Sequence, residues 1–248
     1  MNNNMIRLES SGYLRGSDLF GNERPVRMVS LSPYLIDRLP VTNADFALFI
    51  DEGGYRDRLL WTPLGWEFVT THRLNCPNYW HDPNWNAPQM PITGVSWWEA
   101  LAYARFLGKT LPTEAQWEFA AGQGQRLYPW GAEAPTQEHA NFAPGCEPAE
   151  LNRRATGVEE LPCNFAASGC RDMAGNIGEW CLDNAAQDYS WDLTGHDPIY
   201  LTDEHNAHIV RGGSGLHDED CLRCASRDNY TPSLRDNIVG IRCVKNLS

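Results

Sequence analysis

Three stretches of the chain combine a helix-start signal with apolar residues at helical spacing. In each, a Ser or Thr stands three residues before an Asp, Glu or Gln, a capping-box pattern that satisfies the first backbone N–H groups of a helix. A Gly follows each apolar stretch, which is typical of a helix end. The pattern predicts short helices over about 43–52, between Ser96 and Gly108, and between Thr113 and Gly122.

Alternation of apolar and polar residues predicts strands in other parts of the chain. Residues 6–35 alternate around Ser11-Gly12 and Gly21-Asn22, as short strands joined by turns do. Beyond residue 122, Gly, Pro and Asn separate short apolar segments. Three further strands are expected, near 176–182, 207–214 and 238–245.

Residues 55–94 are rich in Trp, Pro and Asn and show no helix or strand period. We interpret them as a long ordered loop region, and such loops inside a compact domain are often functional. No internal repeat, low-complexity block or Gly/Ser linker marks a domain boundary. The sequence therefore predicts one α+β, loop-rich domain over residues 1–248.

Composition narrows the range of partners and compartments. The chain has 248 residues, 42% of them hydrophobic and 21% charged, as in a soluble protein with a real core. Its net charge of −12 and the lack of a basic stripe argue against nucleic acid or an anionic membrane as partner. No apolar run approaches the roughly 18 residues of a membrane span. The start of the chain has no apolar signal stretch, so a cytoplasmic location and free thiols are expected. The oligomeric state is not specified by the sequence.

The segment 171–180, Arg-Asp-Met-Ala-Gly-Asn-Ile-Gly-Glu-Trp, places acidic and amide side chains around a sharp turn. Gly175-Asn176 suits backbone with positive φ. Oxygen ligands that converge on such a bend are what calcium prefers. A tight hairpin with solvated carboxylates explains the pattern equally well.

Five motifs in one order resemble the formylglycine-generating enzyme (sulfatase-modifying factor) family. The similarity spans nearly the whole chain, including the opening residues 12–16 and 39–46. It implies a heavily elaborated C-type-lectin-like α+β domain with little regular structure. The motifs are Leu111–Ala121, Tyr128–Gly131, Asp172–Trp180, Arg211–Ser214 and Gly240–Arg242.

The same resemblance leaves the activity open. The fold serves oxygen-dependent formylglycine generation with copper, and it forms the C-terminal half of iron-dependent sulfoxide synthases. It also serves oxidases that aromatise reduced heterocycles in pigment and natural-product pathways, and variable ligand-binding proteins. Fold-level analogy does not choose among these activities.

The resemblance implies structural calcium. Its ligands in this chain would be Asp172, the backbone carbonyls of Gly175 and Ile177, and Glu179. A second site of the family begins at an Asn-plus-apolar pair, which Asn141 and Phe142 match. Its remaining ligands would fall within 146–156, where no Asp occurs and where Glu147 or Glu150 could substitute.

The copper chemistry of the family needs two cysteines, since soft thiolates suit copper(I). Alignment on Arg223-Cys-Ala-Ser-Arg227 places Glu219 and Ser214 where the two catalytic cysteines would be. Copper and sulfatase activation are therefore not expected. Cys221 and Cys224 form a Cys-x-x-Cys pair that is a redox pair, a metal half-site or simply two core thiols.

Residues 53–97 look most like the C-terminal domains of the sulfoxide synthases, whose three-histidine iron site comes from a preceding helical domain that this chain lacks. The seven histidines show no spacing typical of an iron site, so iron is not expected. No phosphate loop, dinucleotide-binding glycine motif or nucleophile elbow occurs, and no organic cofactor is expected.

The hypothesis we favour is an oxidase that uses O2 to dehydrogenate a small reduced heterocycle. The substrate would lie in a cleft between the aromatic 79–98 region and residues 214–227. His217 or Glu219 would act as base, Arg223 or Arg227 would stabilise the anion, and Cys221 would be a further catalytic candidate. The alternative is a non-catalytic, calcium-pinned binding module. Candidate substrate-binding residues are Tyr79, Trp80, His81 and Trp85.

Overall fold

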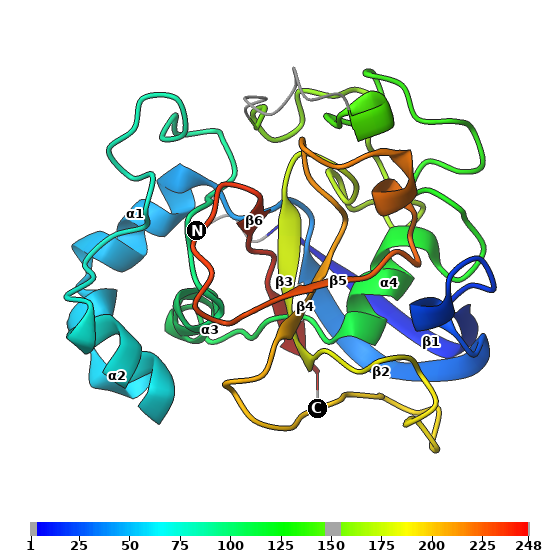
Figure 1. Cartoon of the computed structure of the whole chain (residues 1–248), viewed down its shortest axis with the longest axis horizontal. Coiled ribbons are helices and arrows are strands. Elements are labelled where there is room, and N and C mark those ends of the chain that lie inside the picture. Colours follow the sequence, from blue (N-terminus) through cyan, green and yellow to red (C-terminus); the bar gives the residue numbers. More distant parts are fainter. Residues whose placement is uncertain (1–3, 147–154, 248) are drawn as a thin grey trace.

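Two small sheets and four helices form the framework of the protein, seen in a computed structural model that describes residues 4–146 and 155–247 (Figure 1). The first sheet is antiparallel, with the strand order β1-β2-β7. Its strands are β1 (Met5–Arg15), β2 (Arg27–Asp37) and β7 (Val244–Asn246).

The second sheet has the strand order β5-β4-β3-β6 and carries the candidate site. Strands β3 and β4 are antiparallel, as are β4 and β5, whereas β6 runs parallel to β3. The strands are β3 (Gly178–Asn184), β4 (His208–Arg211), β5 (Asp228–Tyr230) and β6 (Val239–Gly240).

Three of the helices begin where the capping boxes predict. In each helix the side chain of the cap residue, Thr42, Ser96 or Thr113, accepts a hydrogen bond from the backbone N–H of the third helical residue. The side chain of that third residue in turn accepts a hydrogen bond from the backbone N–H of the cap residue. These helices are α1 (Asn43–Asp51), α3 (Trp97–Phe106) and α4 (Glu114–Gly122).

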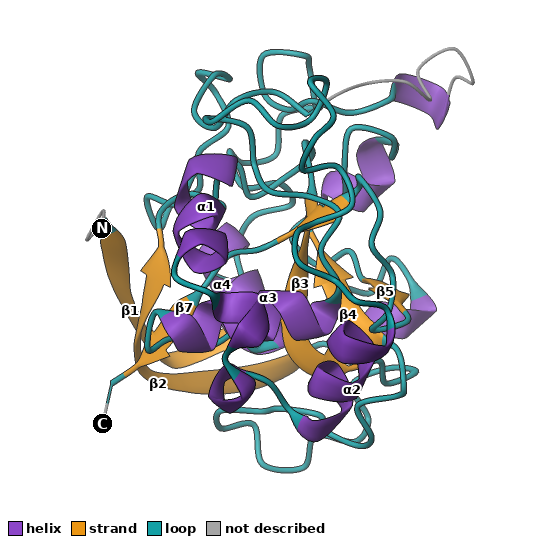
Figure 2. Cartoon of the chain, turned by 90° about the vertical axis from the view of Figure 1, so that its left-hand side faces the viewer, coloured by secondary structure: helices purple, strands orange, loops and turns teal. Residues whose placement is uncertain are grey.

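Helix α4 joins the two sheets. It contacts β1 and β2 of the first sheet and β3 and β4 of the second. The hydroxyl of Tyr13 donates to the carbonyl of Ala115 at 2.9 Å, and that of Tyr34 donates to the carbonyl of Gln116 at 2.8 Å. Helices α1 and α3 cover the other side of the second sheet (Figures 1 and 2). Their apolar side chains form a buried cluster with Trp180 of β3.

The structure corrects three expectations about the elements. The region 55–94 is not all loop, because it contains α2 (Pro63–Thr71), whose cap Thr62 accepts from the Gly65 N–H at 3.0 Å. The expected strand at 238–245 is two short strands, since β6 pairs with β3 and β7 pairs with β2. Residues 6–35 form two long strands, and Ser11-Gly12 lies at a register shift rather than a turn.

The fold class is α+β, as predicted, with long irregular connections between short elements. Across the described residues, no helix has both the length and the hydrophobicity that crossing a membrane requires.

Candidate active site

A pocket of about 250 Å³ lies where the second sheet meets the segment that follows β4. Gly212 and Gly213 come directly after β4 with φ of 98° and 68°, a conformation that favours glycine. The chain leaves the strand at these glycines, and the residues beyond them supply the polar lining of the pocket. That polar lining consists of His217, Cys221, Ser226, Arg227, Asp228 and Tyr230.

His217 is held at both ring nitrogens. Its Nδ1 lies 2.8 Å from the hydroxyl oxygen of Ser214, which also accepts from the N–H of Leu216 at 3.2 Å. Its Nε2 lies 3.8 Å from Oδ2 of Asp228. The side chain of His217 is 25% exposed, whereas Ser214 is buried, so a fixed residue orients an accessible ring. This arrangement suits a group that takes and returns a proton.

Asp228 connects His217 to Tyr230 across β5. The hydroxyl of Tyr230 donates to Oδ2 of Asp228 at 2.5 Å, and the N–H of Asn229 donates to Oδ1 at 2.7 Å. Burial, followed by this hydrogen bond and the carboxylate charge, raises the pKa of Tyr230 above its usual value. Tyr230 therefore keeps its proton at neutral pH and presents a hydroxyl to the pocket.

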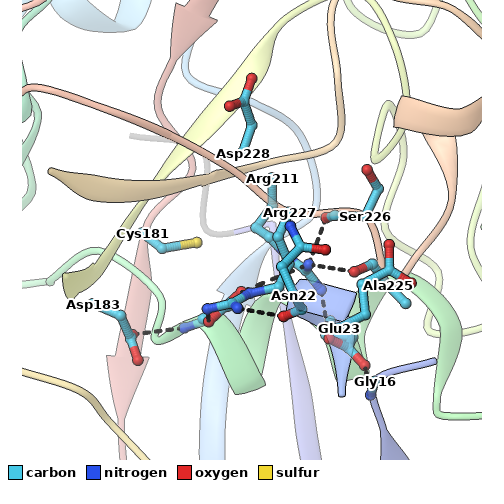
Figure 3. Close-up of polar contacts among 12 residues, drawn as sticks. Gly16, Asn22, Glu23, Cys181, Asp183, Arg211, Ala225, Ser226, Arg227 and Asp228 are labelled. Carbon is cyan, nitrogen blue, oxygen red and sulfur yellow. Dashed lines mark hydrogen bonds and ion pairs between the residues drawn. The ribbon is translucent and has the colours of Figure 1, made fainter. Parts of the chain in front are cut away.

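Arg227 borders the pocket, but its guanidinium is held by Glu114, a carboxylate that it shares with Arg15 and Arg211. Its Nε donates to Oε1 of Glu114 at 2.5 Å and its NH2 group to Oε2 at 3.0 Å. Arg15 donates to the same carboxylate at 2.9 Å, and Arg211 lies 3.7 Å from it. Burial would raise the pKa of Glu114, but the three guanidiniums outweigh it and lower the pKa to about 2. Figure 3 shows Arg211 and Arg227 next to each other, with Asp228 pointing away from both.

Two residues predicted to be catalytic lie elsewhere. Both terminal nitrogens of Arg223 donate to the carboxylate of Glu23, at 2.9 and 2.7 Å, and Arg223 lines a different pocket. The Glu219 carboxylate accepts a long hydrogen bond of 3.5 Å from the N–H of Gly145 and is not part of the pocket lining. The pocket thus brings together His217, Cys221 and Arg227 of the predicted set.

The aromatic residues predicted to bind substrate do not line this pocket. Trp85 and Ser214 both line a separate small cavity. Ile238 lines this cavity and the pocket, and so lies between them. The hydroxyl of Tyr79 donates to Asp236 at 3.3 Å, and Tyr79 packs on Trp85 with ring centroids 5.7 Å apart. Trp80 packs against the apolar cluster of α1 and α3, and His81 lies 3.9 Å from the thiol of Cys76. Between Trp85 and residues 214–216 the structure therefore has this small cavity, which Asn237 and Ile238 also line, in place of the expected cleft.

Cys221 and Cys224 are not joined by a disulfide in the structure, and they line different pockets. Burial raises the pKa of Cys224 and of Cys243, which keeps both protonated. Over residues 4–146 and 155–247, no cluster of three or more His, Cys, Asp or Glu has an arrangement that could hold a metal.

In the segment predicted to bind calcium, Glu179 already has a cation beside it. Its carboxylate accepts from Arg242 at 2.8 Å and from the indole N–H of Trp117 at 2.6 Å, and all three residues are buried. Arg242 also donates to the carbonyl of Arg171 at 2.8 Å. Glu179 therefore fits a calcium site poorly unless the ion shares its carboxylate with Arg242.

Asp172, at the other end of the segment, fits a cation better. It is buried, and within the described part of the chain its carboxylate has one partner, the N–H of Glu159 at 2.8 Å. Asn164 donates to the carbonyl of Ala174 at 2.8 Å, and its own buried Oδ1 has no partner among residues 4–146 and 155–247. Gly175 and Asn176 have φ of 68° and 67°, which confirms the predicted turn.

The second predicted calcium segment lies against the first. The N–H of Asn176 donates to the carbonyl of Asn141 at 2.8 Å, and both Asn141 and Phe142 are buried. Glu147 and Glu150, which would complete that site, lie outside the described residues.

Sequence reasoning did not find Asp228 and Tyr230 as site residues, and it considered Ser214 only as a replaced cysteine. Asp228 and Tyr230 stand two apart in a short strand, so their side chains lie on the same face. That spacing is a usable signal only once 228–230 is known to be a strand at the sheet edge.

Comparison with known proteins identifies the family. The chain is 35% identical over 262 residues to the formylglycine-generating enzyme of Thermomonospora curvata, with 89% of this chain and 84% of that protein covered. It is 32% identical over 246 residues to the hercynine oxygenase of Mycolicibacterium thermoresistibile, covering 89% of this chain but 52% of that protein. The chain thus spans about half the length of the hercynine oxygenases it matches.

The fold is also similar to a solved structure. PvdO from Pseudomonas aeruginosa superposes with a TM-score of 0.74 and 22% sequence identity, over 98% of this chain and 94% of that one. The sulfatase-modifying factor enzyme 1-like domain matches residues 1–247. The chain therefore belongs to the sulfatase-modifying factor, or formylglycine-generating enzyme, family.

Proposed function

We propose that the protein is an oxygen-dependent oxidase of a small molecule, bound in the pocket that His217, Cys221, Asp228 and Tyr230 line. The observation that carries the proposal is His217, fixed by Ser214 on one side and facing Asp228 on the other. The name of the hercynine oxygenase relatives supports oxygen chemistry in this family. The volume of about 250 Å³ suits a substrate of one or two rings.

His217 is the base in this proposal. When Nδ1 donates to Ser214, the Nε2 lone pair is free to accept a proton from the substrate. Asp228, 3.8 Å away, then stabilises the imidazolium. The Tyr230 hydroxyl donates its one proton to Asp228, so its role is to hold that carboxylate in place beside His217. Arg227 and Arg223 have no part in this step, because their guanidiniums are held by Glu114 and Glu23.

Electrons leave the deprotonated substrate for O2. In total, the substrate loses two protons and two electrons, and O2 gains both to become hydrogen peroxide. Dehydrogenation of a reduced heterocycle fits this balance, since the anion formed by the first deprotonation is electron-rich and the product is an extended π-system. No organic cofactor is needed for such a reaction.

Calcium belongs to the proposal as a structural ion. Asp172 would hold it together with the carbonyls of Gly175 and Ile177, and Oδ1 of Asn164, which has no partner among the described residues, supports an oxygen-rich site there. The ion would fix the irregular loops 155–178 against β3. Glu179 would join only by sharing its carboxylate with Arg242.

Oxygen uptake and peroxide release test the oxidase. Wild-type protein is incubated with a panel of dihydro- and tetrahydro-heterocycles in an oxygen electrode. For a compound that is turned over, we expect His217→Gln to lower kcat by about 10²–10⁴-fold and Ser214→Ala by less, with Lys245→Met unchanged as a surface control.

Two other outcomes would replace the proposal. Saturable binding of panel compounds without oxygen uptake would make the chain a binding module of the same fold. An aldehyde formed on a cysteine-containing peptide would assign formylglycine generation, although the two thiols nearest the site line separate pockets.

A further inference from the structure

A second pocket has a volume of about 320 Å³ and shares no lining residue with the candidate active site. It is enclosed by the end of β2 and residues 38–41, the first half of α1, and the end of α3 with Lys109. Gln89 and Val158 close another side. Nothing in the proposed oxidase reaction uses this pocket.

Tyr103 places an unpaired hydroxyl at this pocket. Its side chain is 3% exposed, and its ring stacks on Phe46 with centroids 5.1 Å apart and meets Phe49 edge-on at 6.1 Å. Among the described residues no hydrogen bond holds this hydroxyl, and since it lines the pocket it is open to water or to a ligand there. A ligand with an acceptor oxygen would supply the missing partner.

Lys109 is one of two lysines in the sequence, and it is largely buried at the same pocket. Its Nζ donates to Oδ1 of Asp37 at 2.6 Å, and Oδ2 of Asp37 accepts from the Cys243 N–H at 3.3 Å. Asp37 is thereby satisfied at both oxygens. An ammonium group has three protons to donate, and among the described residues Asp37 alone takes one.

The walls between these polar groups are apolar. Leu39, Val41, Leu107 and Val158 line the pocket, and Leu48 lies at its rim with 47% of its surface exposed. An apolar chain or ring placed here would bury this surface together with its own.

We propose that this pocket binds a small monocarboxylate with an apolar chain or ring, whose carboxylate accepts from Lys109 and from the Tyr103 hydroxyl. The two donors lie beside Asp37, whose carboxylate is already paired at both oxygens, which favours an acceptor group such as a carboxylate over an amine. A monoanion suits the site better than a dianion, because the cations of the lining, Lys109 and Arg38, already have the partners Asp37 and Glu159, and Asp45 stands nearby. A phosphate dianion would be repelled by these carboxylates.

Binding of defined probes to the full chain tests this site. Octanoate, phenylacetate and indole-3-acetate are titrated by calorimetry, with phenylacetamide and inorganic phosphate as uncharged and dianionic comparisons. We expect saturable binding of one carboxylate per chain at about 1 mM or tighter, and none of the amide or phosphate.

Variants locate the binding and separate it from the oxidase site. Tyr103→Phe keeps the ring packing, so it should leave the melting temperature unchanged and weaken carboxylate binding about tenfold. Lys109→Met should abolish binding, while Lys245→Met and His217→Gln should leave it unchanged. No saturable binding by the wild type, full binding by Tyr103→Phe and Lys109→Met, or loss of binding in His217→Gln would each overturn the proposal. The last result would move the carboxylate to the candidate active site.

Discussion

Two buried side chains on neighbouring strands, Asp183 of β3 and His208 of β4, have pKa values shifted away from their usual values by burial. Burial and the nearby Glu114 carboxylate raise the pKa of Asp183 to about 6, although the N–H groups of Glu114 and Tyr200 donate to it at 2.8 and 3.0 Å. Burial lowers the pKa of His208 to about 4, against hydrogen bonds such as that of Nδ1 with the Leu182 carbonyl at 3.2 Å. Each shift makes stability depend on pH, in opposite directions.

Between pH 3.8 and 6 the folded protein holds a proton on Asp183 that the unfolded chain has lost, so this group makes the free energy of unfolding fall as pH rises. Between pH 4 and 6.5 the unfolded chain holds a proton on His208 that the folded protein lacks, so His208 makes the free energy of unfolding rise as pH rises. Each contribution is about 3 kcal/mol, and they offset each other.

We expect Asp183→Asn to give a free energy of unfolding that rises with pH between about 4 and 6, and His208→Gln to give one that falls, measured by urea unfolding at several pH values. Profiles parallel to the wild type in both variants would contradict this.

At the residue scale, the sequence identifies chemical groups but not which of them are already paired. His217 and Cys221 could be predicted because they follow the Arg211–Ser214 motif, where the family resemblance places its reactive segment. The pairing of Arg223 with Glu23 spans 200 positions, so no local pattern indicates it. The same holds for Arg227 and Glu114, which are 113 residues apart. Long-range ion pairs therefore hold both predicted anion-binding residues, of which Arg227 lines the pocket and Arg223 lies outside it.

At the scale of elements, the turn over 172–179 is the one whose stability depends on a proposed ion. We expect EGTA to lower the melting temperature by about 5 °C or more, because an ion that binds only the folded state stabilises it in proportion to its occupancy. Asp172→Ala should melt lower and lose its response to EGTA, whereas Glu52→Ala, which removes an exposed carboxylate, should keep it. Equal melting of the wild type in calcium and in EGTA would mean that Arg242 alone supplies the positive charge at Glu179.

Helices were easier to predict than strands because their starting signals are local. The capping boxes at Thr42, Ser96 and Thr113 form in the structure as the sequence predicts. Helix α2 was missed although Thr62-Pro63 is a cap followed by a favoured first residue, since the surrounding Trp and Pro residues hide its period. The strand expected at 238–245 divides between two sheets, and only its tertiary partners determine where it divides.

At the scale of the whole molecule, buried polar contacts tie the two sheets together and join the apolar cluster of Trp180 to that of Trp117. Glu179 in β3 binds Trp117 of α4 and Arg242, which lies between β6 of one sheet and β7 of the other. The tryptophans of the clusters are therefore coupled to the same framework. The prediction that residues 1–248 form one domain rests on the lack of a linker or internal repeat in the sequence, and these contacts give a physical reason to expect cooperative unfolding.

Denaturant unfolding tests that prediction. Tryptophan fluorescence and far-ultraviolet circular dichroism should report one transition with a common midpoint, as a cooperative single domain gives. Arg242→Met leaves Glu179 as a buried carboxylate without its guanidinium, so it should lower the free energy of unfolding by about 3–5 kcal/mol. Because Arg242 links the sheets, the variant should shift the midpoints of both probes together. A fluorescence transition that separates from the dichroism transition, in the wild type or after this substitution, would show that the helices α1–α3 and the first sheet unfold as separate units.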